Sequence, residues 1–283
     1  MRPASPGESH RHHDAVPAPH LEVLAPGVAV WGGQGGFGRP NAAVVIDHDG
    51  LTVVDTLMVA SQWSPFAAAV EAIGRPVRRV VLTSSHIPFV GGTSCFWAAG
   101  FYGTETASEL LDLPPNVAGY RRLVPALAHE FDDDLRTRPI SHVVDRDALL
   151  TDAVVVRITG GQSAENLVVD LPGAGVLLAG SMATFGTTPL AFDGDPGRWA
   201  AELYELASAE RIVVPGHGPI GGSADLLILA DYLSACAAGH IPSGPWDRWS
   251  DRHFDSSNLE RAAMLADGDL RLPPSLLALL GLR

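Results

Sequence analysis

Short stretches of apolar residues, bounded by Gly, Pro, Asn and Asp, recur along the chain from residue 21 onward and predict β-strands. The first three are Val28–Trp31, Ala42–Ile46 and Leu51–Asp55, and the turn sequence Asp-His-Asp-Gly joins the second to the third. Strands of this length with turn residues between them are typical of a meander. We therefore expect a meander of short strands in this part of the chain.

Helical signals follow and alternate with further strands. Ser64 and Pro65 are residues typical of the N-cap and first position of a helix, which should end at Gly74, and a strand is predicted at Arg79–Leu82. The same alternation after residue 150 predicts a layered sheet with helices on its outer faces. The later elements are strands at Val154–Ile158, Leu167–Leu171, Val176–Leu178 and Arg211–Val214, and helices that open at Asp195 and Ser223.

The pattern divides the chain into three parts. Residues 1–20 are rich in Pro, Ser and His and have too few apolar side chains to offset the entropy of ordering, so we expect a disordered tail. Residues 21–239 form one domain, in which the Pro-interrupted stretch 114–139 is predicted to be a helical excursion or lid. Residues 240–283 are predicted to be a loop and short helices packed on the domain. Three aromatic residues of this segment either anchor it to the core, cover an apolar substrate or form a homodimer surface: Trp246, Trp249 and Phe254.

Composition narrows the possible functions. The chain of 283 residues is 46% hydrophobic and has neither a signal-peptide core nor an apolar run of the ~18 residues that span a membrane, so we expect a cytoplasmic protein without a membrane partner. Its formal net charge of −13 repels phosphate backbones, so no nucleic-acid partner is expected. Every basic residue is Arg, and the lack of Lys excludes Schiff-base catalysis and a P-loop. Cys95 and Cys236 do not have the spacing of a disulfide scaffold or zinc knuckle.

The glycine-rich segment 33–38, Gly-Gln-Gly-Gly-Phe-Gly, formally matches a dinucleotide-binding fingerprint. That fingerprint requires a helix directly after the glycines, because the helix N-terminus holds the pyrophosphate. Here Arg39-Pro40-Asn41 leads into another strand instead. We therefore interpret the segment as a flexible loop over the mouth of a site, and we expect no cofactor.

Five short motifs, in order and at suitable spacing, resemble those of the metallo-β-lactamase superfamily over residues 21–229. They are Asn41 with Val-Val-Asp-Thr at 53–56, Thr-Ser-Ser-His-Ile-Pro-Phe-Val-Gly-Gly at 83–92, Gly-Gly-Gln-Ser at 160–163, Ala-Gly-Ser at 179–181 and Pro-Gly-His-Gly at 215–218. The resemblance implies an α/β fold, the four-layer αββα sandwich shared with hydrolases of the glyoxalase II type.

The resemblance also implies where zinc ligands would stand, and most of them are replaced. The ligand positions correspond here to Ser84, His86 and Gln162 for one zinc, to Pro88, Phe89 and His217 for the other, and to Ser181 for the bridging carboxylate. Hydroxyl and amide groups are poor donors to zinc, and Pro and Phe offer no donor. Each site keeps one imidazole, so we expect a degenerate site without a metal.

Two hypotheses about function follow. In the first, the protein is a metal-independent enzyme that acts on a small organic molecule by hydrolysis, elimination, or cyclisation or isomerisation assisted by proton transfer. Imidazole suits this chemistry because its unperturbed pKa of ~6.5 lies near neutral pH. The residues expected to act on the substrate are His86, His217, Ser84 and Ser181, and those expected to contact it are Ser85, Gln162, Ser163, Phe89 and Glu165.

In the second hypothesis, the protein has lost catalysis and keeps the scaffold as a binding or partner module. His86 and His217 are then satisfied buried histidines, and Pro88 and Phe89 fill the space of the metals. A third possibility is a metal-dependent hydrolase in which other residues rebuild an atypical metal site. Measurements of metal content and of turnover in His variants separate these possibilities.

Overall fold

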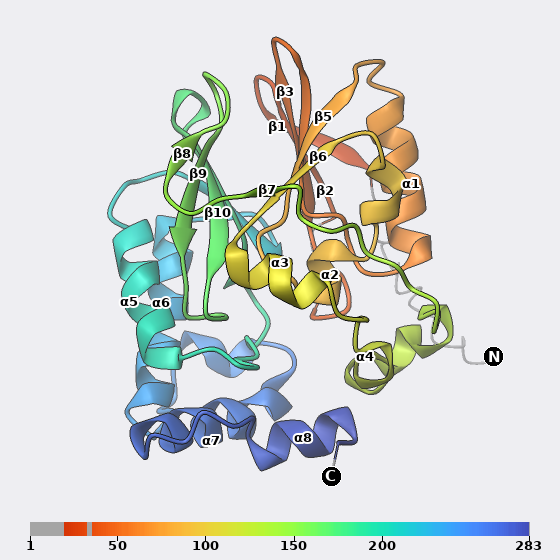
Figure 1. Ribbon diagram of the computed structural model, residues 1–283. Coiled ribbons are helices and arrows are strands. Elements are labelled where there is room, and N and C mark those ends of the chain that lie inside the picture. The colour runs from red at the N-terminus through yellow and green to blue at the C-terminus, as the bar shows by residue number, and fades with distance from the viewer. Residues whose placement is uncertain (1–19, 33–35, 283) are drawn as a thin grey trace, which may run out of the picture.

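Two β-sheets pack face to face, and helices cover the outer face of each sheet (Figure 1). This computed structural model describes residues 20–32 and 36–282. The expected disordered tail therefore lies outside the described residues, apart from His20. The four-layer αββα sandwich predicted from the sequence is confirmed.

The first sheet runs in the order β1 to β7, and its first four strands form the predicted antiparallel meander. The next strands are added in parallel. The strands are β1 (Leu21–Ala25), β2 (Val28–Trp31), β3 (Ala42–Asp47), β4 (Gly50–Val54), β5 (Val77–Val81), β6 (Gly100–Gly103) and β7 (His142–Val143).

The second sheet runs in the order β13-β12-β11-β10-β9-β8. Its pairs are antiparallel except for β11 and β12, which are parallel. The strands are β8 (Ala148–Leu149), β9 (Val155–Thr159), β10 (Asn166–Leu171), β11 (Val176–Thr184), β12 (Ile212–His217) and β13 (Gly221–Gly222).

Alternation along the strands decides which layer each side chain enters. In β3, Ala43 and Val45 point between the sheets, whereas Ala42 and Val44 face the layer of the first helix. In β11, Leu178 likewise lies between the sheets. Successive side chains of a strand point to opposite faces, so a strand that is apolar throughout can bury both of them.

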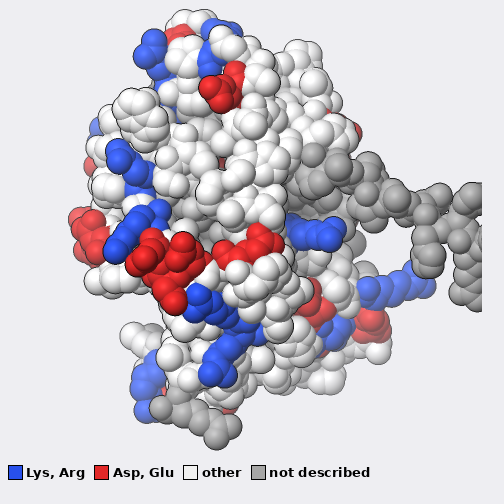
Figure 2. Space-filling model, turned by 90° about the vertical axis from the view of Figure 1, so that its right-hand side faces the viewer, with Lys and Arg blue, Asp and Glu red and all other residues white. Residues whose placement is uncertain are grey.

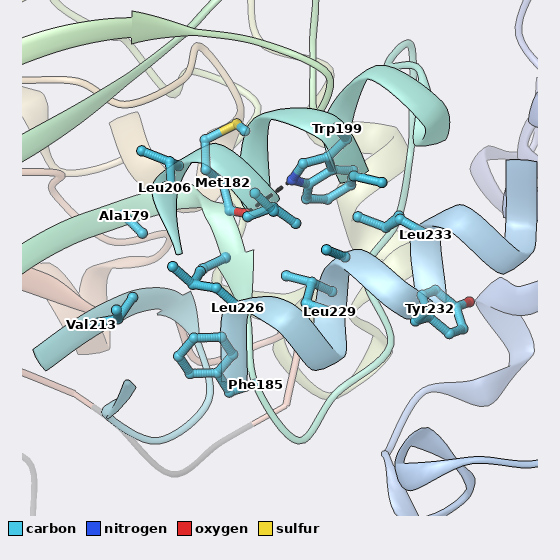
Figure 3. Close-up of a cluster of buried hydrophobic side chains, with 14 of the residues drawn as sticks. Ala179, Met182, Phe185, Trp199, Leu206, Val213, Leu226, Leu229, Tyr232 and Leu233 are labelled. Carbon is cyan, nitrogen blue, oxygen red and sulfur yellow. Dashed lines mark hydrogen bonds between the residues drawn. The ribbon is translucent and has the colours of Figure 1, made fainter. Parts of the chain in front are cut away.

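Helices α5 and α6 cover the second sheet, and Figure 3 shows their apolar side chains meeting those of β11. There the buried Trp199 indole donates a hydrogen bond of 2.9 Å to the carbonyl of Met182. The α-helices are α1 (Ala60–Glu71), α2 (Ile87–Val90), α3 (Glu105–Leu111), α4 (Val117–Leu123), α5 (Pro196–Leu206), α6 (Ser223–Ala237), α7 (Asp255–Ala266) and α8 (Pro274–Leu280). The 3₁₀-helices are Thr93–Phe96, Pro125–Glu130, Pro172–Ala174, Pro245–Arg248 and Arg252–Phe254.

The predicted start of α1 at Ser64-Pro65 is wrong. The helix begins at Ala60, and Pro65 lies inside it. The Val59 carbonyl accepts hydrogen bonds from the N–H groups of Gln62 and Trp63, so a turn has already formed before Pro65. Pro65 removes one bond of the second turn, and the burial of residues such as Val59 on this side of the sheet outweighs that loss.

Helix α7 joins two segments that are distant in sequence. The buried Arg261 guanidinium donates to the carbonyls of Asp193 and Gly194, which lie before α5, and to those of Leu270 and Arg271, which lie before α8. Hydrogen bonds from a charged donor are stronger than neutral ones. The loop before α5 and the C-terminal segment are therefore held to each other through one side chain.

The face that carries α1 has charges of both signs. On the face that carries α1, Arg side chains lie beside Asp and Glu side chains and form no broad basic area (Figure 2). No helix within residues 20–32 and 36–282 is long and apolar enough to cross a membrane.

Candidate functional site

His86 lies directly before α2, and its position depends on a close approach of two backbone segments. A Cβ on Gly91 would lie 2.3 Å from the carbonyl oxygen of Met58, and one on Gly92 would lie 2.3 Å from that of Thr56. Side chains cannot occupy such positions. The Gly91-Gly92 pair therefore lets the chain after His86 pack against residues 56–58, where Thr56 also bonds to the Phe89 carbonyl.

Hydrogen bonds hold the His86 imidazole in one tautomer. The backbone N–H of Ser163 donates to the Asn166 side-chain oxygen, which orients that amide so that its nitrogen faces Gln162. Asn166 Nδ2 then donates to Gln162 Oε1 at 2.9 Å, and Gln162 Nε2 lies 3.1 Å from His86 Nδ1. Since Gln162 presents a donor, Nδ1 must accept, and the proton of the neutral imidazole is on Nε2.

This network extends inward to a buried carboxyl group. Asn166 Nδ2 also donates to Ser181 Oγ, and Ser181 Oγ donates to the Thr83 carbonyl. Thr83 in turn donates to both oxygens of Asp55 through its N–H and its hydroxyl, at 2.8 Å each. Complete burial raises the pKa of Asp55 to about 7, although the two bonds from Thr83 oppose the shift.

His217, at the end of β12, lies in an aromatic box. Its ring stacks on Phe37 at 5.2 Å and meets Phe89 in an edge-to-face contact at 5.6 Å. Its Nδ1 is buried and has no hydrogen-bond partner among the described residues. Burial lowers the pKa of His217 to about 4, against the opposing charge of Asp251. The imidazole is therefore neutral at physiological pH.

Asn41 supports the turn that carries His217. Its side-chain nitrogen donates to the carbonyls of Pro215 and Gly218 at 2.9 Å each, one on either side of the histidine. Phe37 comes from the glycine-rich segment expected to form a loop over the site. Residues 33–35 of that segment lie outside the described residues, but Phe37 itself packs against the imidazole of His217, which we call the inner imidazole.

A small cavity of about 20 Å³ lies between the two imidazoles. Its lining brings together five of the predicted site residues: His86, Phe89, Gln162, Ser181 and His217. A volume of this size admits about one water molecule. An organic substrate does not fit between His86 and His217.

A second pocket, of about 320 Å³, is also lined by His86 but not by His217. We call it the leucine pocket, because six leucine side chains line it: Leu110, Leu111, Leu113, Leu272, Leu280 and Leu282. Its volume is in the range of small-molecule sites. A hollow beside α1 is larger, at about 800 Å³, but neither imidazole lines it. The leucine pocket is therefore the larger of the two cavities that His86 lines.

Three residues absent from the sequence-based prediction complete the surroundings of His86. The Phe192 ring lies 5.0 Å from the imidazole, and Tyr120 stacks on Phe192 at 6.1 Å. The Asp193 carboxylate lies 3.7 Å from His86 Nε2, which is longer than a hydrogen bond. Burial lowers the pKa of His86, and this effect exceeds the opposing pull of Asp193. Burial also raises the pKa of Tyr120, so its hydroxyl is neutral.

Of the four remaining predicted residues, Ser85 lines the leucine pocket, whereas Ser84, Ser163 and Glu165 line neither cavity. Ser84 accepts a hydrogen bond from the His86 backbone N–H at 3.3 Å. The Ser163 hydroxyl donates to the Glu165 carbonyl. The Glu165 carboxylate accepts from the N–H and hydroxyl of Thr106, at the start of α3, and not from either imidazole.

The residues at the small cavity do not fit the zinc centre that the superfamily implies. A catalytic zinc needs about three imidazole, thiolate or carboxylate ligands. Here the described lining residues offer two imidazoles, the hydroxyls of Tyr120, Ser181 and Thr184, and an amide whose nitrogen faces His86 Nδ1, and they include no thiolate or carboxylate. Within residues 20–32 and 36–282, the one His/Cys/Asp/Glu group with ligand atoms within 4.8 Å of each other is Asp47, His48 and Asp49. It lies in the turn between β3 and β4, where Arg79 pairs with Asp49.

Comparison with known proteins agrees with the motifs. A family model described as the metallo-β-lactamase superfamily matches residues 35–271, and the chain belongs to this superfamily. Its structure is similar to that of a metallo-β-lactamase from Hirschia baltica, with 19% identity, a TM-score of 0.58 and coverage of 76% of this chain and 97% of that one. No curated protein matches the chain.

Two further solved structures are similar. The metallo-β-lactamase FIM-1 from Pseudomonas aeruginosa, in its mono-zinc form, has 18% identity and a TM-score of 0.57, with coverage of 75% of this chain and 95% of that one. VMB-1 has 18% identity and a TM-score of 0.63, with coverage of 79% and 100%. Identities this low show the fold alone.

Proposed function

We propose that this chain is a metal-independent enzyme that acts on a small organic molecule bound in the leucine pocket, with His86 at the reacting end. The observation that carries this proposal is the position of the imidazole. His86 is held in one tautomer from the inside by Gln162, and its ring also lines a pocket of about 320 Å³. A preorganised donor in the wall of a largely apolar pocket is typical of an active site.

The tautomer limits what His86 can do. Nδ1 is occupied by the Gln162 amide, and Nε2 carries the proton, so the neutral ring is a donor. Such a donor stabilises negative charge that develops on a substrate oxygen, which occurs in hydrolysis, elimination and enolisation. The Asp193 carboxylate, 3.7 Å from Nε2, is positioned to accept a proton at the same end of the pocket.

His217 has a different place in this proposal. It lines the small cavity and not the leucine pocket, so it acts on the surroundings of His86 and does not touch the substrate. Ser181 likewise serves the hydrogen-bond network, since its hydroxyl donates to the Thr83 carbonyl. The two residues keep the inner side of the site uncharged.

Metal independence rests on the chemistry of the donors. Neutral amide and hydroxyl groups replace the charged ligands, and the aromatic rings of Phe37 and Phe89 flank the remaining inner imidazole. To test it, protein purified without a His tag is analysed for metals and screened with uncharged esters, lactones and enolisable ketones, with and without a chelator. We expect far less than one zinc per chain and turnover that the chelator leaves unchanged. About one zinc per chain, with activity lost on chelation, overturns the proposal in favour of a rebuilt metal site.

The role of His86 is tested by substitution. His86→Ala removes the Nε2 donor, and turnover should fall by about 10²-fold or more. His129→Ala, the same change at an exposed position, is the matched control and should retain full activity. If His86→Ala is as active as the control, His86 has no catalytic role. If a ligand binds the leucine pocket but is recovered unchanged, the binding-module alternative holds.

A further inference from the structure

The leucine pocket is assembled from segments that are far apart in the sequence. Leu110 and Leu113 come from α3 and the loop after it, and Leu272, Leu280 and Leu282 come from α8 and its flanks. The family match ends at residue 271, so the three leucines of this second wall lie outside the matched range.

The pocket is lined by one acidic side chain and by no Arg among the described residues. The acidic side chain is that of Asp193, which is 42% exposed. The whole chain has a formal net charge of −13. An anion in this pocket would lose hydration, would find no cationic partner there and would face a carboxylate. The pocket therefore disfavours anionic molecules.

The His86 side of the pocket offers a donor that a ligand can use. His86 Nε2 carries the proton of the neutral tautomer, and its distance of 3.7 Å from Asp193 leaves that N–H without a full hydrogen bond. The His86 side chain is 17% exposed, so an acceptor on a ligand in the pocket can take the place of water at this donor. The acceptor should be an uncharged oxygen, such as that of a ketone, ester or lactone carbonyl.

We propose that the leucine pocket selects uncharged, largely apolar molecules with one acceptor oxygen, which accepts a hydrogen bond from His86 Nε2, and that the leucines around α8 set the size of the molecule. This inference deepens the proposed function and rests on it for the placement of His86 at the reacting end. The predicted preference for uncharged ligands can be tested by binding alone, whether or not turnover is found.

Three probes of nearly equal shape test the selectivity: methyl naphthyl ketone, naphthoic acid, which is an anion at neutral pH, and isopropylnaphthalene, which has no oxygen. Calorimetry at pH 7.5 should show the ketone binding about tenfold or more tightly than the anion, because only the anion buries an unpaired charge. The hydrocarbon should be weaker than the ketone by a few-fold, owing to the lost hydrogen bond. Asp193→Asn should reduce the difference between ketone and anion, mainly by strengthening binding of the anion.

The location is tested by filling the pocket from its rim. Leu282 is 46% exposed, so Leu282→Trp narrows the mouth without rearranging the core and should weaken ketone binding about tenfold. Leu270→Trp places the same indole at a position that is 77% exposed and outside the lining, and it should bind like the wild type. Leu113→Trp, on the opposite wall and 61% exposed, should act like Leu282→Trp and replaces it if that variant does not fold.

Each outcome is decisive. Equal or tighter binding of the anion by the wild-type protein overturns the proposed ligand class, and unchanged binding in both rim variants overturns the location. Selective binding of the ketone in a protein that turns over none of the screened substrates supports this inference and contradicts the proposed function. If the wild type turns over a substrate and His86→Ala does not, but the ketone and the anion bind equally well, this inference alone is contradicted.

Discussion

His217→Phe tests whether the inner imidazole is held neutral by burial. The substitution keeps a ring between Phe37 and Phe89 but removes the group that titrates. In the folded chain the pKa of His217 is about 4, because of burial, whereas the ordinary value in an unfolded chain is ~6.5. The unfolded chain therefore binds this proton more tightly. The resulting stability is fully present above about pH 6.5 and is lost as the pH falls toward 4.

The magnitude follows from these two pKa values. Between pH 7 and pH 5, protonation of the unfolded state lowers the free energy of unfolding by about 2 kcal/mol in the wild type. Phe at position 217 contributes no such change. The variant should therefore gain about 2 kcal/mol relative to the wild type between pH 7 and pH 5. Any constant cost of fitting the larger ring cancels in this comparison.

The assay is equilibrium unfolding in urea at both pH values for wild type and variant. His129→Phe, at an exposed position, controls for the loss of an imidazole as such and should show no comparable change between the two pH values. If the stability difference between His217→Phe and wild type is the same at pH 7 and pH 5, the imidazole is not held neutral, and the closed inner cavity inferred from its surroundings is wrong.

Three further predictions concern the hydrogen-bond network of His86 and the four contacts of Arg261, which we call the clamp. The pKa of Asp55 is raised to about 7, so its contribution to stability is present below about pH 4 and is lost as the pH rises through 7. The free energy of unfolding of Asp55→Asn in urea should therefore rise by about 3 kcal/mol relative to wild type between pH 5 and pH 8. No such rise would contradict a buried neutral carboxyl group. Gln162→Glu places an acceptor at Nδ1 and should raise the pKa of His86 in an NMR titration, whereas an unchanged value would contradict the assigned tautomer. Arg261→Met leaves four carbonyls unbonded and should lower the unfolding free energy by about 3 kcal/mol, while Arg248→Met, at an exposed position, should have little effect; equal effects would contradict the clamp.

The error at α1 arose where tertiary packing overrode a local rule. Pro65 is typical of the first turn of a helix, yet α1 begins at Ala60, because burial of Val59 and Phe66 stabilises an earlier turn. Glu165 as a substrate contact stays a prediction. Its carboxylate bonds to Thr106 at the start of α3, a contact that no spacing along the chain reveals.

The sequence by itself determined the layers and the frame of the site. Strands such as β3 are apolar at every other or every position, and the pleat converts that pattern directly into buried faces. Asp195 was identified as an N-cap because its chemistry is local, and its side chain accepts from the N–H groups of Gly197 and Arg198. His86 and His217 were found because both lie in short motifs that can be read without coordinates.

Only the tertiary structure decided which cavity those histidines serve. Tyr120, Asp193 and Leu280 come from segments separated by 73 and 87 positions, and no periodicity or motif links them. The structure places a cavity of about 20 Å³ between the two imidazoles and a pocket of about 320 Å³ beside one of them. The site is divided into a small inner cavity and a larger apolar pocket by the way side chains fill the space around His86. Volume depends on how distant side chains fill space, and the order of residues along the chain does not specify it.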